Sequence, residues 1–238
     1  MWFSRVTLET SALSLESLAS FYGDDLQLNI GHRSAEGFAF GLGETTIEFV
    51  ARPGEPFYHF AVLIPGNRFD QALDWINGQA TLLPDPDSGE LRIDFDNWAA
   101  SACYFHDPAG NIVELIAHRG FVETDSAGDF LSREIVGLSE LGLVGDPPEM
   151  AHRLAQGLDL NVWDGILDIP ERLAFVGERA RSLILSRPGR GWRPTGRPAE
   201  LHPLEAVLTG TSTGEVELEG SLYRIRSLSP ADLPGAVR

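Results

Sequence analysis

The sequence contains no lysine and a single cysteine. Arginine carries all of its basic side-chain charge, and the 238 residues hold 35 acidic against 18 basic side chains, for a net charge of −17. A surface of that sign repels nucleic-acid phosphates and anionic lipids, so we expect neither as a partner. Because Cys103 is alone, no disulfide can form within the chain. This is typical of a protein of the reducing cytoplasm.

Long apolar runs and targeting signals are missing as well. No segment approaches the roughly 20 consecutive apolar residues that a membrane-spanning helix needs. The start, MWFSRVTLET, lacks the basic, apolar and small-residue regions of a secretory signal peptide. The glycine-containing stretches GLG and GRG lack the spacing of a phosphate-binding loop, so nucleotide binding is not expected. The hydrophobic fraction of 43% is that of an ordinary globular protein, and we expect a cytoplasmic one.

The chain repeats one pattern three times. Residues 5–30, 59–83 and 139–163 each begin with a short apolar strand, continue through an amphipathic helix and lead into further short strands. In the second repeat, Phe69 and Ile76 bracket a stripe of apolar residues at helical spacing. Repetition of the order β-α-β-β-β predicts an α+β fold, in which tandem βαβββ modules form curved, mostly antiparallel sheets around a cup-shaped pocket.

Two irregular segments punctuate these modules. Residues 121–132 are small and polar, and they divide the chain into an N-terminal pair of modules (1–120) and a C-terminal pair (133–238). The last module is degenerate, because its strands lack a helix. Residues 187–200 form a loop rich in glycine, proline and arginine, which Trp192 is expected to attach to the body of the protein. Its arginines could grip an anionic ligand or simply pair with the acidic surface; they are Arg187, Arg190, Arg193 and Arg197.

The segments FYHFAVLIP and YFHDPAGNIVELIAH carry a family resemblance. They resemble the second module of the vicinal oxygen chelate superfamily, which includes glyoxalases, bleomycin-resistance proteins and extradiol dioxygenases. The most specific part is DPAGNIVEL, in which a turn leads into a strand whose glutamate points into the cup. The resemblance extends over residues 3–119 and continues as module pattern alone beyond them. It implies a small-molecule ligand, and a cup completed either within a monomer or in a homodimer.

The resemblance also implies a set of metal ligands. In this superfamily a divalent metal commonly lies in the cup, and the matching positions here are Arg5, Glu48, His59 and Glu114. Arg5 has no lone pair to offer, so the expected metal ligands are Glu48, His59 and Glu114. The C-terminal modules show no matching set. A metal site is therefore expected in the N-terminal half, with Mn²⁺, Fe²⁺, Ni²⁺ or Zn²⁺ as the ion.

Two functions follow from these residues. In the first, the protein is a metal-dependent lyase, isomerase or dioxygenase that acts on a small molecule with vicinal oxygens, with Glu48 and Glu114 as catalytic groups. In the second, equally plausible, no metal is bound. Arg5 and a protonated His59 then balance the two carboxylates, and the cup sequesters a ligand as bleomycin-resistance proteins do.

Other residues are candidates for lining the pocket. Arg5 and Tyr104 are expected to face it, and Trp98 is either a pocket wall or part of the core. His106 alternates onto the same strand face as Tyr104, where it lines the cup or caps the DPAG turn.

Overall fold

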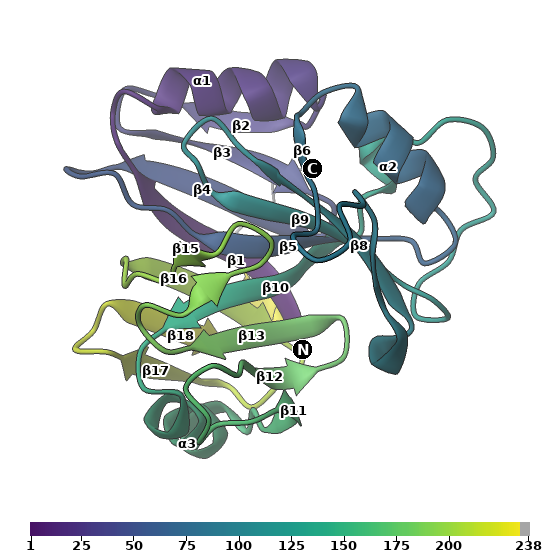
Figure 1. The fold of residues 1–238 in the computed structure, drawn as a ribbon. Coiled ribbons are helices and arrows are strands. Elements are labelled where there is room, and N and C mark those ends of the chain that lie inside the picture. The colour runs from purple at the N-terminus through teal and green to yellow at the C-terminus, as the bar shows by residue number, and fades with distance from the viewer. Residues whose placement is uncertain (234–238) are drawn as a thin grey trace.

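The computed structural model describes residues 1–233, and these form two curved sheets and a small hairpin (Figure 1). The first module consists of β1 (Trp2–Thr10), α1 (Leu15–Ser20), the π-helical turn η1 (Phe21–Asp25), β2 (Ile30–Arg33), β3 (Gly37–Leu42) and β4 (Thr45–Ala51). The second consists of β5 (His59–Ile64), α2 (Phe69–Asn77), β6 (Leu82–Leu83), β7 (Ile93–Phe95), the 3₁₀ turn η2 (Asp96–Trp98), β8 (Ala100–His106) and β9 (Ile112–His118).

A 3₁₀ turn, η3 (Ser132–Glu134), precedes the C-terminal modules. The third module consists of β10 (Gly137–Val144), α3 (Pro147–Leu158), β11 (Val162–Gly165), β12 (Ala174–Glu178) and β13 (Arg181–Ser186). The small hairpin is β14 (Gly191–Trp192) and β15 (Arg197–Pro198). The fourth module consists of β16 (Leu204–Thr209), β17 (Gly214–Leu218), β18 (Tyr223–Ser227) and the 3₁₀ turn η4 (Pro230–Asp232), without an α-helix in its described residues. The predicted α+β fold is confirmed.

Each sheet combines one module from residues 1–120 with one module from residues 133–238. The first sheet has the strand order β17-β18-β16-β1-β4-β3-β2, so it joins the first module to the fourth. The second sheet has the order β11-β12-β13-β10-β5-β9-β8-β6, with β7 paired to β8, and joins the second module to the third. Each sheet therefore takes strands from both sides of residues 121–132, and each completes its curved surface within one chain.

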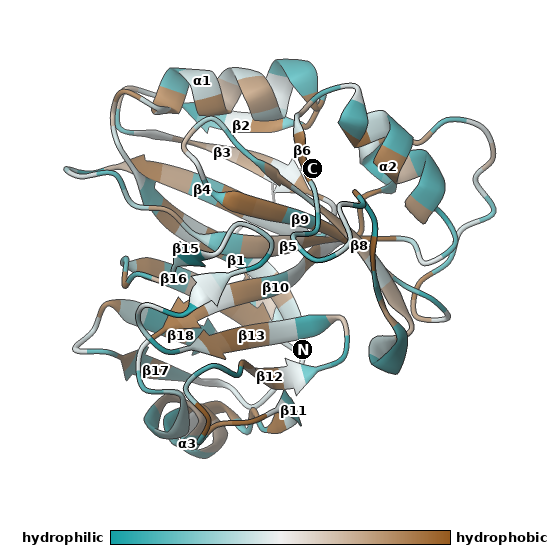
Figure 2. Cartoon of the chain, in the orientation of Figure 1, coloured by the Kyte–Doolittle hydropathy of each residue, from teal (hydrophilic) through white to brown (hydrophobic). Residues whose placement is uncertain are grey.

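Strand alternation assigns every residue to one of two faces. On β1, Val6 and Leu8 face an apolar core that the helices help to cover, whereas Arg5 and Thr7 face the other way. The core of the second sheet is continuous with that of the first, and Figure 2 shows the apolar residues concentrated along the strands. We call the opposite face of each sheet its cup face. No helix in the described residues is long and apolar enough to cross a membrane.

The DPAGN turn ties the first module to the second. Both oxygens of the buried Asp107 carboxylate are used: Oδ1 accepts from the backbone N–H groups of Ala109 and Asn111, each at 3.0 Å. Oδ2 accepts from the Asn111 amide at 2.7 Å and from the Tyr22 hydroxyl at 2.9 Å. Asn111 in turn accepts the Tyr58 N–H at 2.8 Å, directly before His59 at the start of β5. The turn thus fixes the strands that carry the candidate site.

Replacing Asp107 by alanine should lower the free energy of unfolding by about 3 kcal/mol, because it leaves several buried donors unsatisfied. Urea unfolding followed by tryptophan fluorescence measures the change. Asp125→Ala serves as the matched control, since Asp125 is exposed. Equal unfolding midpoints for the two variants would contradict this account of the turn.

Candidate metal centre

One histidine and two glutamate side chains converge on the cup face of the second sheet. His59 begins β5, and Glu114 lies on β9, its parallel neighbour, where Ala61 pairs with Glu114. On the other side of β5, the antiparallel strand β10 places Glu140 opposite Ala61. The two glutamates therefore flank one small residue, and His59 lies two positions before it on the same face. We call His59, Glu114 and Glu140 the His59 cluster.

The cluster is compact and buried. One ligand atom from each side chain lies within 4.8 Å of the other two. The residue His59 is 6% exposed, and the two glutamates are 3% exposed each. Nε2 of His59 is 3.7 Å from Oε2 of Glu114. Its Nδ1 lies 3.1 Å from the Ile112 carbonyl, so Nδ1 carries the proton in that contact.

Burial sets the protonation of all three groups. Burial and, to a smaller extent, the positive charge of Arg190 lower the pKa of His59 to about 4, so the imidazole is neutral near pH 7. Burial raises the pKa of Glu140 and, together with the Glu140 carboxylate, that of Glu114. A hydrogen bond from the Tyr104 phenol opposes the rise at Glu114. Two neighbouring carboxylates in these surroundings cannot both stay ionised without a cation.

These surroundings fit a divalent cation. With Nδ1 protonated, the lone pair of His59 Nε2 faces a carboxylate, an arrangement that is favourable only when a proton or a metal lies between them. Oε1 of Glu140 is buried and has no hydrogen-bond partner in the described residues. One imidazole and two carboxylates are a donor set suited to first-row divalent ions. His59, Glu114 and Glu140 would hold the ion.

Glu48 is not part of this cluster. It lies on β4 in the first sheet, where its carboxylate accepts hydrogen bonds from Arg5 at 3.1 Å and Thr7 at 3.4 Å. His32 is also near, with Nε2 3.5 Å from Oε1 of Glu48. The structure thus brings together two of the three expected ligands, His59 and Glu114, and separates the third by placing β4 in the other sheet. Arg5, expected in the same pocket, stays with Glu48.

The second acid of the cluster comes from a module to which the sequence assigned no ligand. Glu140 is the acid of the SELGLVG segment, which lacks histidine at the position matching His59. A register shift between Leu138 and Glu140, where β10 pairs with β5, brings the glutamate opposite Ala61. The available signal was a lone acid in an otherwise apolar strand, since a buried carboxylate is costly without a partner.

The first sheet repeats the strand register of the His59 cluster, with Arg5 at the position that matches His59. Arg5 and Glu48 have the mutual register of His59 and Glu114, because Arg5 pairs with Thr46 as His59 pairs with Ile112. Glu205 on β16 lies opposite Thr7, as Glu140 lies opposite Ala61. We call Arg5, Glu48 and Glu205 the Arg5 cluster. Its acids already have cations, since Arg5 pairs with Glu48, and Arg224 and Arg226 pair with Glu205 at 3.6 and 3.7 Å.

The hairpin of β14 and β15 covers the His59 cluster. The ring of Trp192, 3% exposed, lies 5.0 Å from that of His59, and Gly142 makes room for it. A Cβ at Gly142 would lie 3.0 Å from the indole. Arg193 pairs with Asp85 and Asp87, and Arg197 donates to the Gly110 carbonyl at 3.0 Å and lies over the Phe57 ring. The expected attachment of this loop by Trp192 is therefore seen, and it closes the cup.

Comparison with solved structures identifies this architecture. No family model matches the sequence, and no curated protein matches it. Glyoxalase I from Zea mays is similar over 97% of this chain and 93% of its own, with a TM-score of 0.52 and 11% identity. A putative dioxygenase from Bacillus subtilis is similar over 99% of this chain and 86% of its own, with a TM-score of 0.54 and 16% identity. The chain has the glyoxalase fold.

The predicted α+β architecture of curved sheets built from βαβββ modules is thus confirmed. Within this glyoxalase fold, the remaining candidate pocket residues have different surroundings. Tyr104 stacks beside His59, with ring centroids 6.3 Å apart. His106 is exposed, and its Nδ1 lies 3.3 Å from the Asn111 carbonyl, at the DPAG turn. Trp98 forms an aromatic group with Trp163 and Phe175 and donates to Asp164, and it packs against the apolar group that includes Tyr104 and Trp192.

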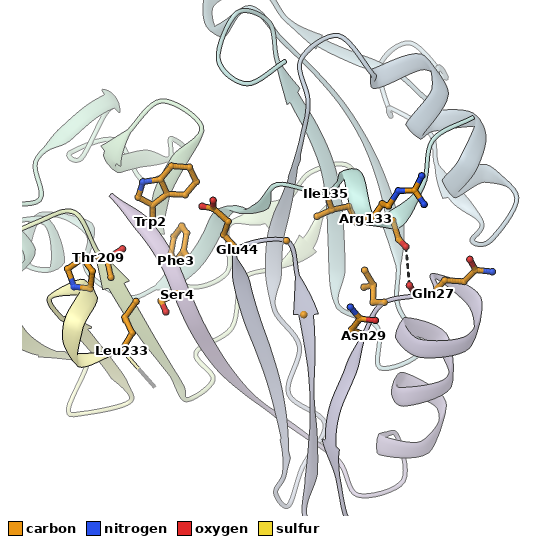
Figure 3. A pocket seen from close by; sticks show the side chains of 15 residues that line it. Trp2, Phe3, Ser4, Gln27, Asn29, Glu44, Arg133, Ile135, Thr209 and Leu233 are labelled. Carbon is orange, nitrogen blue, oxygen red and sulfur yellow. Dashed lines mark hydrogen bonds between the residues drawn. The ribbon is translucent and has the colours of Figure 1, made fainter. Parts of the chain in front are cut away.

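A separate hollow of about 1080 Å³ lies elsewhere in the glyoxalase fold (Figure 3). Trp2, Ser4, Asn29, Glu44 and Arg133 are among its lining residues. Its lining contains one acid and neither histidine nor cysteine, so this hollow offers no metal-binding group comparable to the His59 cluster.

Proposed function

We propose that the protein is a metal-dependent enzyme of the glyoxalase and dioxygenase type. In this proposal the His59 cluster holds one divalent cation, and the substrate is a small molecule with two neighbouring oxygens. The supporting observation is the convergence of one neutral imidazole and two buried carboxylates, one with an unpartnered oxygen. A bound Mn²⁺, Fe²⁺, Ni²⁺ or Zn²⁺ supplies Lewis-acid chemistry towards such oxygens.

The residues around the cluster have separate roles in this proposal. The Tyr104 phenol stays protonated near pH 7, because burial raises its pKa, and its hydrogen bond orients Glu114. Glu114 would be the group that moves a proton on the substrate, because its carboxylate lies in the cup and is oriented by the Tyr104 phenol. Trp192 excludes water from the closed cup, which strengthens every electrostatic interaction inside it. Glu48, bonded to Arg5 in the other sheet, has no part in this chemistry.

Metal titration tests the proposal directly. Protein stripped with a chelator should take up about one equivalent of a divalent cation per chain, measured by isothermal titration calorimetry and by elemental analysis after gel filtration. The expected stoichiometry follows from a single cluster of this kind among the described residues. No uptake of Mn²⁺, Fe²⁺, Ni²⁺ or Zn²⁺ would refute the enzyme proposal.

A metal-free binding protein is the second candidate. Its support is the Arg5 cluster, in which this chain neutralises the equivalent carboxylates with arginine and needs no metal. The metal-free arrangement expected from the sequence places Arg5 and a charged His59 in one cup. It lacks support, because Arg5 lies in the other sheet and His59 is neutral. Failure of metal uptake together with binding of a small organic ligand would favour this function.

A further inference from the structure

A second hollow lies at the base of the hairpin that closes the cup. It measures about 540 Å³ and is formed where the end of β13 and the start of β14 meet the loop between β11 and β12. Its lining residues are Pro170, Glu171, Arg187, Pro188, Gly189, Arg190 and Gly191. Two arginines therefore face one small space in a chain whose net charge is −17.

Arg187 has no protein partner for its charge. Its Nε is buried and lacks a hydrogen-bond partner, and no carboxylate among residues 1–233 lies within 4.0 Å of its guanidinium. A partly buried guanidinium without an acceptor loses hydration and gains nothing in return. An anion bound in the hollow would supply the missing acceptor.

Arg190 uses only neutral acceptors. Its Nε donates to the Glu171 carbonyl at 3.0 Å and its Nη1 to the Gly191 carbonyl at 2.8 Å, which links the loop to the hairpin. The exposed Glu171 carboxylate also borders the hollow, but it forms no ion pair with either arginine. Burial lowers the pKa of Arg190, whereas its neighbour Arg193 has a raised pKa because Asp85 binds it. The positive charge of Arg190 is therefore not neutralised by the protein.

The hollow is connected to the His59 cluster through the hairpin. The charge of Arg190 acts on the His59 imidazole and lowers its pKa. Gly191, in the wall of the hollow, is followed directly by Trp192, whose ring covers His59. A ligand held by the two arginines would thus lie beside the closed cup, with the hairpin between its anionic end and the acids.

We propose that Arg187 and Arg190 bind a carboxylate or phosphate group of the small molecule whose reacting end enters the His59 cup. This assignment of an anionic substrate rests on the proposed function, whereas binding of the anion itself does not. Arginine suits the role because its planar guanidinium donates two parallel hydrogen bonds to either anion. The acidic net charge disfavours anion binding over most of the surface, so an anion is attracted to the hollow that Arg187 and Arg190 line.

Titration of metal-free protein with inorganic phosphate, and separately with malonate, tests the assignment. Ionic strength is held constant with sodium chloride, and isothermal titration calorimetry reports the affinity. We expect saturable binding, weakened about tenfold by Arg187→Gln, since one charge-assisted pair of hydrogen bonds is lost. Tighter phosphate binding would assign a phosphate group, and tighter malonate binding a carboxylate. Because the Arg187 guanidinium forms no ion pair with the described residues and its Nε no hydrogen bond, we expect Arg187→Gln to fold like the parent protein, which urea unfolding verifies.

Arg172→Gln is the matched control, since Arg172 is exposed on the adjoining loop and should leave the affinity unchanged. Non-saturable heats with both anions, or equal affinities for the parent protein and Arg187→Gln, would overturn the proposal. A Glu140→Gln variant separates the two questions, because it should keep anion binding while losing the metal site. Retained anion binding in Glu140→Gln would show that the anion site does not depend on the metal site. Failure of the parent protein to take up metal, with anion binding retained, would count against the proposed function alone.

Discussion

Replacing Glu140 by glutamine should weaken divalent-metal binding by about 100-fold or more. Glutamine preserves the shape of the side chain but removes one of two negative charges and a strong oxygen donor. Loss of residues that merely orient metal ligands already weakens binding by about 10- to 100-fold, so loss of a ligand should exceed that range. Calorimetric titration of chelator-stripped protein with Mn²⁺ or Ni²⁺ measures the change.

Glu48→Gln provides the decisive control for that measurement. The resemblance of the sequence to the vicinal oxygen chelate pattern predicts Glu48 as a ligand, whereas the structure pairs it with Arg5 in the other sheet. We expect Glu48→Gln to bind metal like the parent protein. Urea unfolding of both variants verifies that they fold. Weaker metal binding in Glu48→Gln with unchanged binding in Glu140→Gln would reverse the assignment of the third ligand.

The sequence predicts two of the three residues of this centre because those two belong to one module. His59 and Glu114 belong to one module, and the DPAGN turn that sets the start of β9 is visible in the residues. Their proximity follows from parallel pairing within that module, which the module pattern already implies. The module order β-α-β-β-β is local in the same sense, since each helix shows its apolar stripe and each strand its alternation.

The third ligand depends on pairing between modules, which no local pattern encodes. Either β4 or β10 could have completed the His59 cup, and the choice is made by which first strands pair across the molecule. In the structure β5 pairs with β10, and β1 pairs with β16. A register shift beside Glu140 then decides which side chain of β10 faces the cup. The sequence shows an acid in an apolar strand, but neither the partner strand nor the register.

Metal-free protein should lose stability as the pH rises from 6.5 to 8. Burial raises the pKa values of Glu114 and Glu140 in the folded state, while an unfolded glutamate titrates near pH 4.3. The folded state therefore binds more protons than the unfolded state across this interval, so its free energy of unfolding falls as those protons are removed. The expected slope is about 1.4 kcal/mol per pH unit for each proton involved.

Below pH 6.5 the buried histidines oppose this fall in the free energy of unfolding. Burial lowers the pKa values of His59 and His118 to about 4, so both contribute stability that increases as the pH rises towards 6.5. Between pH 6.5 and 8 the unfolded imidazoles lose their remaining protons, so this opposing contribution fades and the carboxyl pair dominates the slope. Urea unfolding at several pH values between 6.5 and 8 gives the curve.

A saturating divalent cation should abolish this slope, because both carboxylates are then ionised in the folded state and their charge is compensated. The Glu114→Gln/Glu140→Gln double variant should lose the slope without any metal, since an amide does not titrate. It retains Cys103, whose buried thiol also has a raised pKa, so the difference between the two curves isolates the carboxyl pair. Equal pH dependence of the parent protein and the double variant would contradict this account. It would mean that Glu114 and Glu140 are ionised in the folded metal-free protein, so that their burial does not require a cation in the cup.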